Sequence, residues 1–261
     1  MIEGLRARAA RAYFVLCLAL GRMLRSATYS TVRFVHQDGQ RVVRKHRRAY
    51  APLLIWMSGL LVRALDAGVR VLPQREWEAR ERRIYGSLYE ASIGVDAGGV
   101  LVLPYLAEHP LATLLEDPEL GESVRKRAVQ LATVALAEFH RRGLTHADAM
   151  AENVLVDLEA GVAYWFDFET VHDASRPLAW RRADDVRALL VTSVLRTIPE
   201  QRAETLTLIL DVYGDEAVTR VVATNFASVW RRPLTFHLAQ AGTPFECFLE
   251  IGRLLRERLG D

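Results

Sequence analysis

Lysine is almost absent from this chain of 261 residues. Of its 34 lysine and arginine residues, only Lys45 and Lys126 are lysines. Arginine offers a planar fork of donors, whereas lysine offers a compact point charge on a flexible stem. A lysine kept in a chain that otherwise uses arginine therefore indicates a geometric requirement at that position.

Cysteine is also scarce, because Cys17 and Cys247 are the only two. Two cysteines are too few for a disulfide framework, and their scarcity favours a reducing compartment. No low-complexity linker and no internal repeat interrupts the chain. With 51% hydrophobic and 25% charged residues, the composition suits one unit with a substantial core rather than several independent domains.

No apolar run reaches the roughly 18–20 residues that a membrane-spanning helix needs. The two longest runs cover residues 13–20 and 52–62, and arginines flank both. Either run could lie in a membrane interface or pack in a core, because periodicity does not separate these cases. The first run could also be the apolar part of a secretory signal.

Positive charge is concentrated in the first third of the chain. Residues 1–90 hold 17 Lys/Arg against 7 Asp/Glu, a net of +10, and residues 91–261 hold 17 against 25, a net of −8, which together give the overall +2. The basic part also contains both apolar runs, so it favours contact with an anionic membrane. Nucleic acid is not expected, because the arginines alternate with aliphatic runs instead of forming a polar stripe with stacking aromatics.

The most informative segment is His-Ala-Asp-Ala-Met-Ala-Glu-Asn-Val-Leu-Val-Asp, residues 146–157. Two β-rich runs, 154–156 and 162–166, are separated by the turn residues 158–161, which predicts a hairpin. The ends of this hairpin would bring Asn153 and Asp167 side by side, with Asp148 close by. One carboxylate to accept a proton and two oxygen ligands for magnesium are what a phosphoryl-transfer site requires.

This pattern resembles the catalytic loop and metal turn of the protein-kinase-like superfamily, H-x-D-x-x-x-x-N followed by a D-F-G-type turn. The resemblance implies that Asp148 is the catalytic base, that His146 braces the loop, and that Asn153 and Asp167 bind magnesium. It also implies ATP and Mg²⁺ as cofactors. The implied fold is α+β and bilobal, with a small N-terminal sheet plus a helix and a mostly helical C-terminal lobe.

Kinase-like enzymes hold the nucleotide phosphates with a strand lysine that an acid on the next helix positions. Lys45 fits the first role, at the end of a hairpin formed by strands 30–35 and 40–45. On the helix expected over 74–89, Glu81 shares the inward face with Trp77 and Ile84, so it is the expected partner. Glu78 is the alternative.

The expected division places a basic N-terminal helix and the N-lobe in residues 1–104 and the C-lobe in residues 105–261. A strand over 99–104 should lead into an interlobe hinge, where Leu103 and Tyr105 would contact the adenine. Helices are expected over 111–115, 122–142, 183–196, 200–212, 216–229 and 247–259. Asp185 either accepts hydrogen bonds from the catalytic-loop backbone, as the resemblance implies, or is an ordinary acid at a helix N-terminus.

Departures from the protein-kinase pattern indicate the branch. No G-x-G-x-x-G precedes Lys45, and residues 26–30 occupy its place; no Ala-Pro-Glu follows the metal turn. Met150 stands where protein Ser/Thr kinases usually have a lysine, and Glu169 replaces the glycine of D-F-G. The chain is therefore more similar to small bacterial branches: lipopolysaccharide and Kdo kinases, RIO-type kinases and aminoglycoside-type phosphotransferases.

The favoured interpretation is an ATP- and Mg²⁺-dependent kinase that phosphorylates a hydroxyl of a sugar or lipid-linked glycan at the cytoplasmic membrane face. The alternatives are a RIO-like protein Ser/Thr kinase and a pseudokinase that serves as a binding or scaffold module. A cytoplasmic location, peripheral on the inner face of the membrane, is expected, and ATP dependence argues against a secretory signal. The first apolar run would then be a helix docked on the small lobe or lying on lipid.

Overall fold

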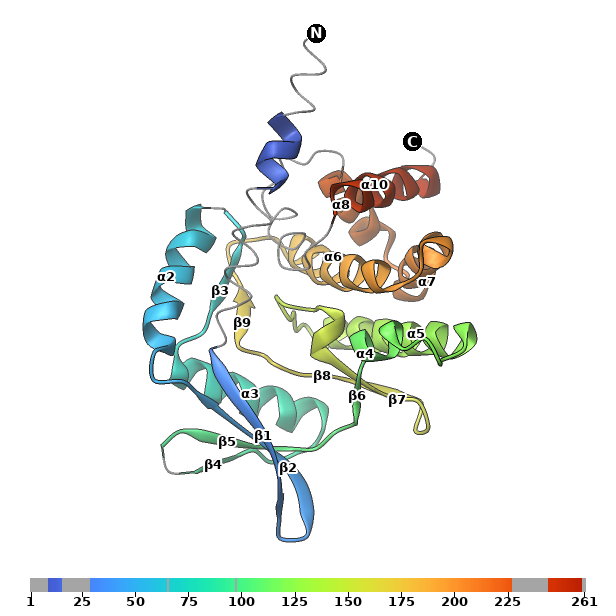
Figure 1. Ribbon diagram of the computed structural model, residues 1–261. Coiled ribbons are helices and arrows are strands. Elements are labelled where there is room, and N and C mark those ends of the chain that lie inside the picture. The colour runs from blue at the N-terminus through green and yellow to red at the C-terminus, as the bar shows by residue number, and fades with distance from the viewer. Residues whose placement is uncertain (1–8, 16–28, 65, 97, 227–243, 260–261) are drawn as a thin grey trace.

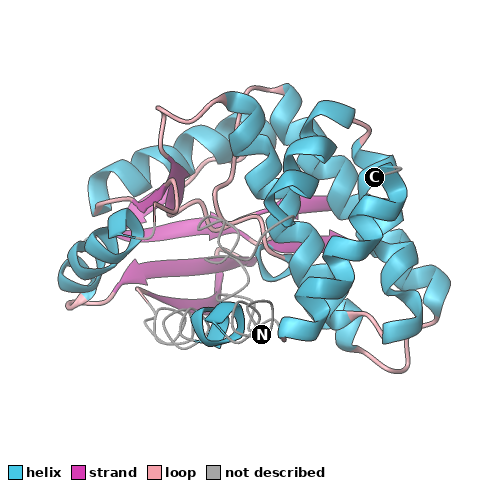
Figure 2. Ribbon diagram, turned by 90° about the horizontal axis from the view of Figure 1, so that it is seen from above, coloured by secondary structure: helices cyan, strands magenta, loops and turns pink. Residues whose placement is uncertain are grey.

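The computed structural model describes residues 9–15, 29–64, 66–96, 98–226 and 244–259. They form a bilobal α+β fold of the kinase-like type, as the sequence predicts. Figure 1 shows the two lobes: a β-sheet with helix α3 makes the smaller one, and stacked helices make the larger one. Figure 2 shows the helices crowded on the side that carries the C-terminus.

A four-stranded antiparallel sheet forms the N-terminal lobe, in the order β1-β2-β5-β4. The strands are β1 (Ser30–Gln37), β2 (Gln40–Arg47), β4 (Gly94–Asp96) and β5 (Val100–Pro104). The β1–β2 turn places Asp38 and Gly39 at φ angles of 52° and 77°, a left-handed conformation that Asp-Gly turns adopt readily. Helix α3 (Gln74–Leu88) buries Trp77, Glu81 and Ile84.

The C-terminal lobe is mostly helical. Its helices are α4 (Leu111–Glu116), α5 (Glu122–Arg141), α6 (Leu178–Arg196), α7 (Arg202–Tyr213), α8 (Glu216–Phe226) and α10 (Phe245–Leu259), with short 3₁₀ turns at Ala151–Asn153 and Pro199–Gln201. Leu136 of α5 and Leu189 of α6 are fully buried in a core shared by most of these helices. Because these apolar faces meet, the helices form one packed core beneath the loops between α5 and α6.

Two small sheets pair strands of the segment between α5 and α6 with strands from earlier in the chain. Strands β6 (His109–Pro110), β7 (Val154–Asp157) and β8 (Val162–Trp165) form one sheet, and β7 and β8 are the predicted hairpin. Strand β3 (Val69–Val71) pairs antiparallel with β9 (Thr170–His172), which follows the metal turn. The segment leading into α3 is thus hydrogen-bonded to the segment that leaves the metal turn.

Helix α6 begins earlier than the sequence analysis predicts. The expected start was residue 183, but the helix begins at Leu178, directly after Pro177 with φ −54°. The proline ring sets φ close to a helical value and its missing N–H is no loss at a helix start. The prediction was wrong because the extra turn, Leu-Ala-Trp-Arg-Arg, has no side-chain capping signal.

The two apolar runs have different surroundings. In the first run, residues 9–15 are helical and Phe14 is 1% exposed, packed against Phe245 and Phe248 of α10 at ring-centroid distances of 5.2 and 5.9 Å. Docking of this turn on the small lobe was therefore a wrong expectation, because its apolar partner is in the C-terminal lobe. Residues 16–20 of the run lie outside the described residues.

The second run forms helix α2 (Ala51–Ala64), which is inserted between β2 and β3 and lies at the outer flank of the molecule (Figure 1). Ala51, Ser58 and Val62 are buried on its inner side. Four large apolar residues at helical spacing are exposed on its outer side: Leu53 by 60%, Trp56 by 64%, Met57 by 49% and Leu60 by 51%. In the described part of the chain, every helix is too short or too polar to span a bilayer.

Candidate active site

The backbone of the loop after α5 is hydrogen-bonded to one buried carboxylate. Asp185, 0% exposed on α6, accepts hydrogen bonds from the backbone N–H groups of His146 and Ala147, both at 2.7 Å. Its Oδ2 also lies 2.9 Å from His140 Nε2. Ala147 has a φ of 72°, an unfavourable left-handed conformation for alanine. Of the two interpretations of Asp185, the structure thus supports the one in which it holds the loop.

His146 connects this loop to the strand that precedes the metal turn. Its Nε2–H donates to the Phe166 carbonyl at 2.9 Å, and its ring packs against Trp165 and Phe168. Burial lowers the pKa of His146 to about 4, although the charge of Asp185 opposes this shift. The imidazole is therefore neutral at physiological pH and acts as a spacer with one directed hydrogen bond.

The hairpin brings the three predicted catalytic and metal residues together. Val154 pairs with Trp165, and the N–H of Phe166 donates to the Asn153 carbonyl at 3.0 Å, so Asp167 follows next to Asn153. Asn153 Nδ2 donates to both the carbonyl oxygen and the Oδ2 of Asp148, each at 2.8 Å. Asp167 has a φ of 66°, which aspartate tolerates better than most residues.

Asp148 has the electrostatics of a base that works near neutral pH. Burial and the negative charge of Asp167 raise the pKa of Asp148 to about 8, while the hydrogen bond from Asn153 opposes the shift. A carboxyl with a raised pKa is a stronger base once ionised, which suits proton removal from an alcohol. The geometry is therefore compatible with the role predicted for Asp148.

Lys45 lies at the centre of an acidic cluster and is only 5% exposed. Its Nζ contacts the Asp167 carboxylate directly and lies 3.8 Å from Glu169 Oε2 and 4.0 Å from Glu81 Oε1. Burial lowers the pKa of Lys45, but the three carboxylates outweigh burial and raise it. The lysine is therefore charged, and it lies between Asp167 of the predicted metal turn and Glu81 of α3.

Of the two candidate acids on α3, Glu81 is the one that the structure places beside Lys45. Its Oε1 accepts hydrogen bonds from Trp77 Nε1 at 2.9 Å and from the backbone N–H of Phe168 at 3.3 Å. Burial raises the pKa of Glu81 to about 7, against the lowering effect of Lys45. Glu78, the alternative partner, accepts a hydrogen bond from Gln74 instead.

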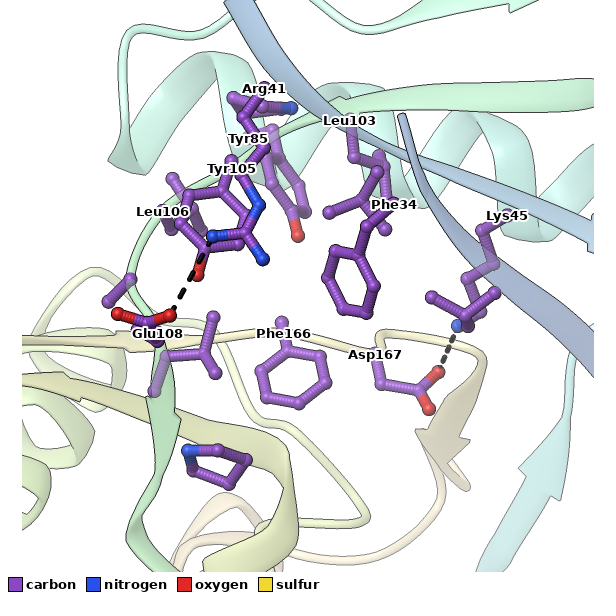
Figure 3. Close-up of a pocket in the computed structure, with 16 residues that line it drawn as sticks. Phe34, Arg41, Lys45, Tyr85, Leu103, Tyr105, Leu106, Glu108, Phe166 and Asp167 are labelled. Atoms are coloured by element: carbon purple, nitrogen blue, oxygen red, sulfur yellow. Dashed lines mark hydrogen bonds and ion pairs between the residues drawn. The ribbon is translucent and has the colours of Figure 1, made fainter. Parts of the chain in front are cut away.

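A cavity of about 350 Å³ runs from the hinge to Lys45 and Asp167 (Figure 3). Leu103 and Tyr105, the residues predicted to contact adenine, both line it. Arg41 forms part of its rim, with its guanidinium 4.1 Å from the centroid of the Tyr105 ring and 3.7 Å from Glu108 Oε1. The cavity has an apolar outer part and a charged inner end, which matches the two halves of a nucleotide.

The sequence analysis missed Arg41, although the chain contains the signal. Side chains of a strand alternate between its two faces, so Arg41, Val43 and Lys45 share one face of β2. All three line the cavity. Counting back in steps of two from the predicted lysine would have found the rim residue.

The residues at the inner end fit magnesium, whose sites in this class use one or two carboxylates together with the substrate phosphates. Asp167 supplies a carboxylate, and Asn153 offers its Oδ1 because its Nδ2 is used toward Asp148. Among the residues that the structure describes, no group of three His, Cys, Asp or Glu side chains is arranged to hold a metal ion.

The bilobal fold, the cavity between hinge and lysine, and the loop of His146, Asp148 and Asn153 define a protein of the kinase-like class. Residues 107–209 match the family model described as lipopolysaccharide kinase (Kdo/WaaP) family. This stretch contains the predicted catalytic loop, the predicted metal turn and α6, and the match confirms the resemblance to the lipopolysaccharide and Kdo kinase branch. It also supports a phosphotransferase. No curated protein matches the chain.

Proposed function

We propose that this protein is an ATP- and Mg²⁺-dependent kinase that transfers phosphate to a hydroxyl of a sugar or lipid-linked glycan at the cytoplasmic face of a membrane. One observation carries the proposal: Lys45 and Asp167 line the inner end of a single cavity, and Asn153, hydrogen-bonded to Asp148, is held next to Asp167. The match of residues 107–209 to a family of lipopolysaccharide kinases supports the acceptor class.

In the proposed reaction, Asp148 takes the proton of the acceptor hydroxyl as the oxygen attacks the γ-phosphorus. The bond between that phosphorus and the β–γ bridging oxygen breaks, and ADP leaves. Lys45, held by Glu81, neutralises charge on the nucleotide phosphates. Asn153 and Asp167 would hold magnesium, which supplies charge neutralisation at the phosphates when it is bound. Leu103 and Tyr105 would enclose the adenine.

The reaction is tested by incubating the protein with Mg²⁺, γ-labelled ATP and one of three acceptors: dephosphorylated lipopolysaccharide, a free Kdo-containing oligosaccharide, or casein. Label in lipopolysaccharide, lost in Asp148→Asn, is the expected result. Label in casein or in the protein itself would favour the RIO-like alternative. A protein that melts at a higher temperature with ATP but labels nothing would favour the pseudokinase alternative.

Membrane attachment is the second part of the proposal, and α2 supports it. The outward residues Leu53, Trp56, Met57 and Leu60 form one apolar face, and the exposed Arg63 lies one turn further along the same helix. A shallow apolar face next to basic residues is typical of helices that lie in a membrane interface. The +10 net charge of residues 1–90 adds attraction to anionic headgroups. The protein would then be a cytoplasmic peripheral enzyme.

A further inference from the structure

Arg47, the last residue of β2, carries a buried positive charge. Its side chain is 6% exposed, and none of its three guanidinium nitrogens has a hydrogen-bond partner among the described residues. The nearest acid is Glu169, whose Oε2 lies 4.0 Å away, beyond hydrogen-bond distance. A buried guanidinium with five unused N–H donors is costly, so the arrangement indicates a missing anionic partner.

The register of β2 shows where this partner would lie. Val43 pairs with Leu103 and Lys45 pairs with Leu101, so β2 runs away from the hinge. Arg47 follows Lys45 by two residues on the same face of the strand, about 6.6 Å further along. Adenine at the hinge and the inner phosphates at Lys45 would leave the outermost phosphate directed toward Arg47.

Arg47 shares a neighbour with Lys45, which lines the inner end of the cavity. Its Cζ lies 4.9 Å from the centroid of the Trp77 ring, and Lys45 Nζ lies 5.1 Å from the same centroid. Burial raises the pKa of the neighbouring Tyr29, and the negative charges of Glu169 and Asp148 add to this shift while Arg47 opposes it. Arg47 thus shares one electrostatic neighbourhood with the predicted base.

We propose that Arg47 binds the terminal phosphate of ATP and so performs with a side chain what a glycine-rich loop performs with backbone N–H groups. The inference rests on the proposed ATP-dependent kinase function. The planar guanidinium can donate two parallel hydrogen bonds to one phosphate, an arrangement that lysine lacks. Glu169, in the position where other kinase-like chains have glycine, faces the guanidinium at 4.0 Å and stabilises its positive charge while no nucleotide is bound.

The proposal is tested by measuring two affinities with Mg²⁺ by titration calorimetry: one for ADP and one for an ATP analogue with an imido bridge between the β- and γ-phosphates. Arg47→Gln should weaken binding of the analogue by on the order of tenfold to a hundredfold, the usual effect of a lost charge-assisted hydrogen bond. Its ADP affinity should stay within about twofold of wild type. Arg47→Lys should fall in between.

Arg33→Gln is the matched control, because it removes the same charge from an exposed residue on the opposite face of the same hairpin. It should change neither affinity. Equal losses for ADP and the analogue in Arg47→Gln would overturn the proposal and indicate a purely structural role. If Arg47→Gln binds the analogue and ADP with the same ratio of affinities as wild type, the proposal is also overturned. That result would point to an anionic group of the acceptor as the partner of Arg47.

The remaining outcomes separate the role of Arg47 from the folding of its variants and from the kinase function itself. If Arg47→Gln does not fold, Arg47→Lys is judged by the same criterion, a selective loss for the analogue. A wild-type protein that binds neither nucleotide would refute the kinase function itself and the role of Arg47 with it. A wild-type protein that binds both, with Arg47 variants that do likewise, would refute only the role of Arg47.

Discussion

Replacing Asp148 by asparagine separates catalysis from binding and from stability. The change keeps the size of the side chain and leaves an oxygen that can accept the hydrogen bond from Asn153. It removes the carboxylate that is proposed to take the acceptor proton. A positioned base contributes at least about a hundredfold, so phosphate transfer should fall by that factor, equivalent to about 2.7 kcal/mol. ATP affinity should change little, because Asp148 does not line the nucleotide cavity.

The raised pKa adds a stability test. Burial raises the pKa of Asp148 from its ordinary value of 3.8 to about 8 in the folded protein. Between these values the folded state keeps a proton that the unfolded state releases, so stability is lost as pH rises through this window. Asparagine has no such dependence. Because Asp148 as a whole residue is partly exposed, solvent reduces the effect, and we expect Asp148→Asn to be more stable than wild type by on the order of 1–3 kcal/mol at pH 7.

Both effects are measured on the same two proteins. Phosphate transfer is followed with labelled ATP, and the free energy of unfolding is determined in urea at pH 5 and pH 8 without Mg²⁺. The advantage of the variant should grow with pH. A variant that transfers phosphate at the wild-type rate would refute the assignment of the base. A variant that loses stability at both pH values would show that the carboxylate is a structural support, contrary to the reasoning above.

Three further predictions follow from the geometry. Lys45→Met and Glu81→Gln should each slow phosphate transfer, and the double variant should lose much less than the sum, because the pair acts as a unit; additive losses would show that they do not interact. The double variant Trp56→Ser/Leu60→Ser should bind anionic vesicles less at low salt but keep its ATP affinity and stability, since both side chains are exposed. The control Val62→Ser, on the buried side of α2, should instead lower the free energy of unfolding by about 2–4 kcal/mol. A wild-type protein that does not bind such vesicles would exclude membrane attachment. Finally, the pKa of His146 is lowered in the folded state, so the unfolded state takes up the proton first as pH falls. The free energy of unfolding of wild type should therefore decrease by up to about 3 kcal/mol between pH 6.5 and pH 4. In urea unfolding, His146→Phe should show a smaller decrease over the same range.

The catalytic hairpin could be predicted because its information is local. Asn153 and Asp167 flank two strands joined by a four-residue turn, and a hairpin of that length has few alternative registers. Glu81 was predictable for a similar reason, because helix periodicity places it with Trp77 and Ile84, and all three are buried. In both cases the residues that carry the argument are close together along the chain.

Features that depend on distant partners were not predictable. Strands β3 and β9 have three residues each, and their pairing joins segments about a hundred positions apart. The outward orientation of α2 depends on what packs beneath it, since both of its faces are apolar. Strand alternation places Arg47 on the same face as Lys45, but its burial near Trp77 and Glu169 depends on segments that are distant in the chain.

The pairing of β3 with β9 also bears on how such an enzyme can be regulated. Many kinases are switched by ordering or releasing the segment after the metal turn. Here that segment is fastened on one side to the strand that leads into α3, while Glu81 of α3 holds the backbone of Phe168 within the turn. Loosening the turn would break both attachments at once. If the protein is the kinase proposed above, a centre attached in this way would stay assembled without substrates, and the supply of the acceptor would set the rate of phosphorylation.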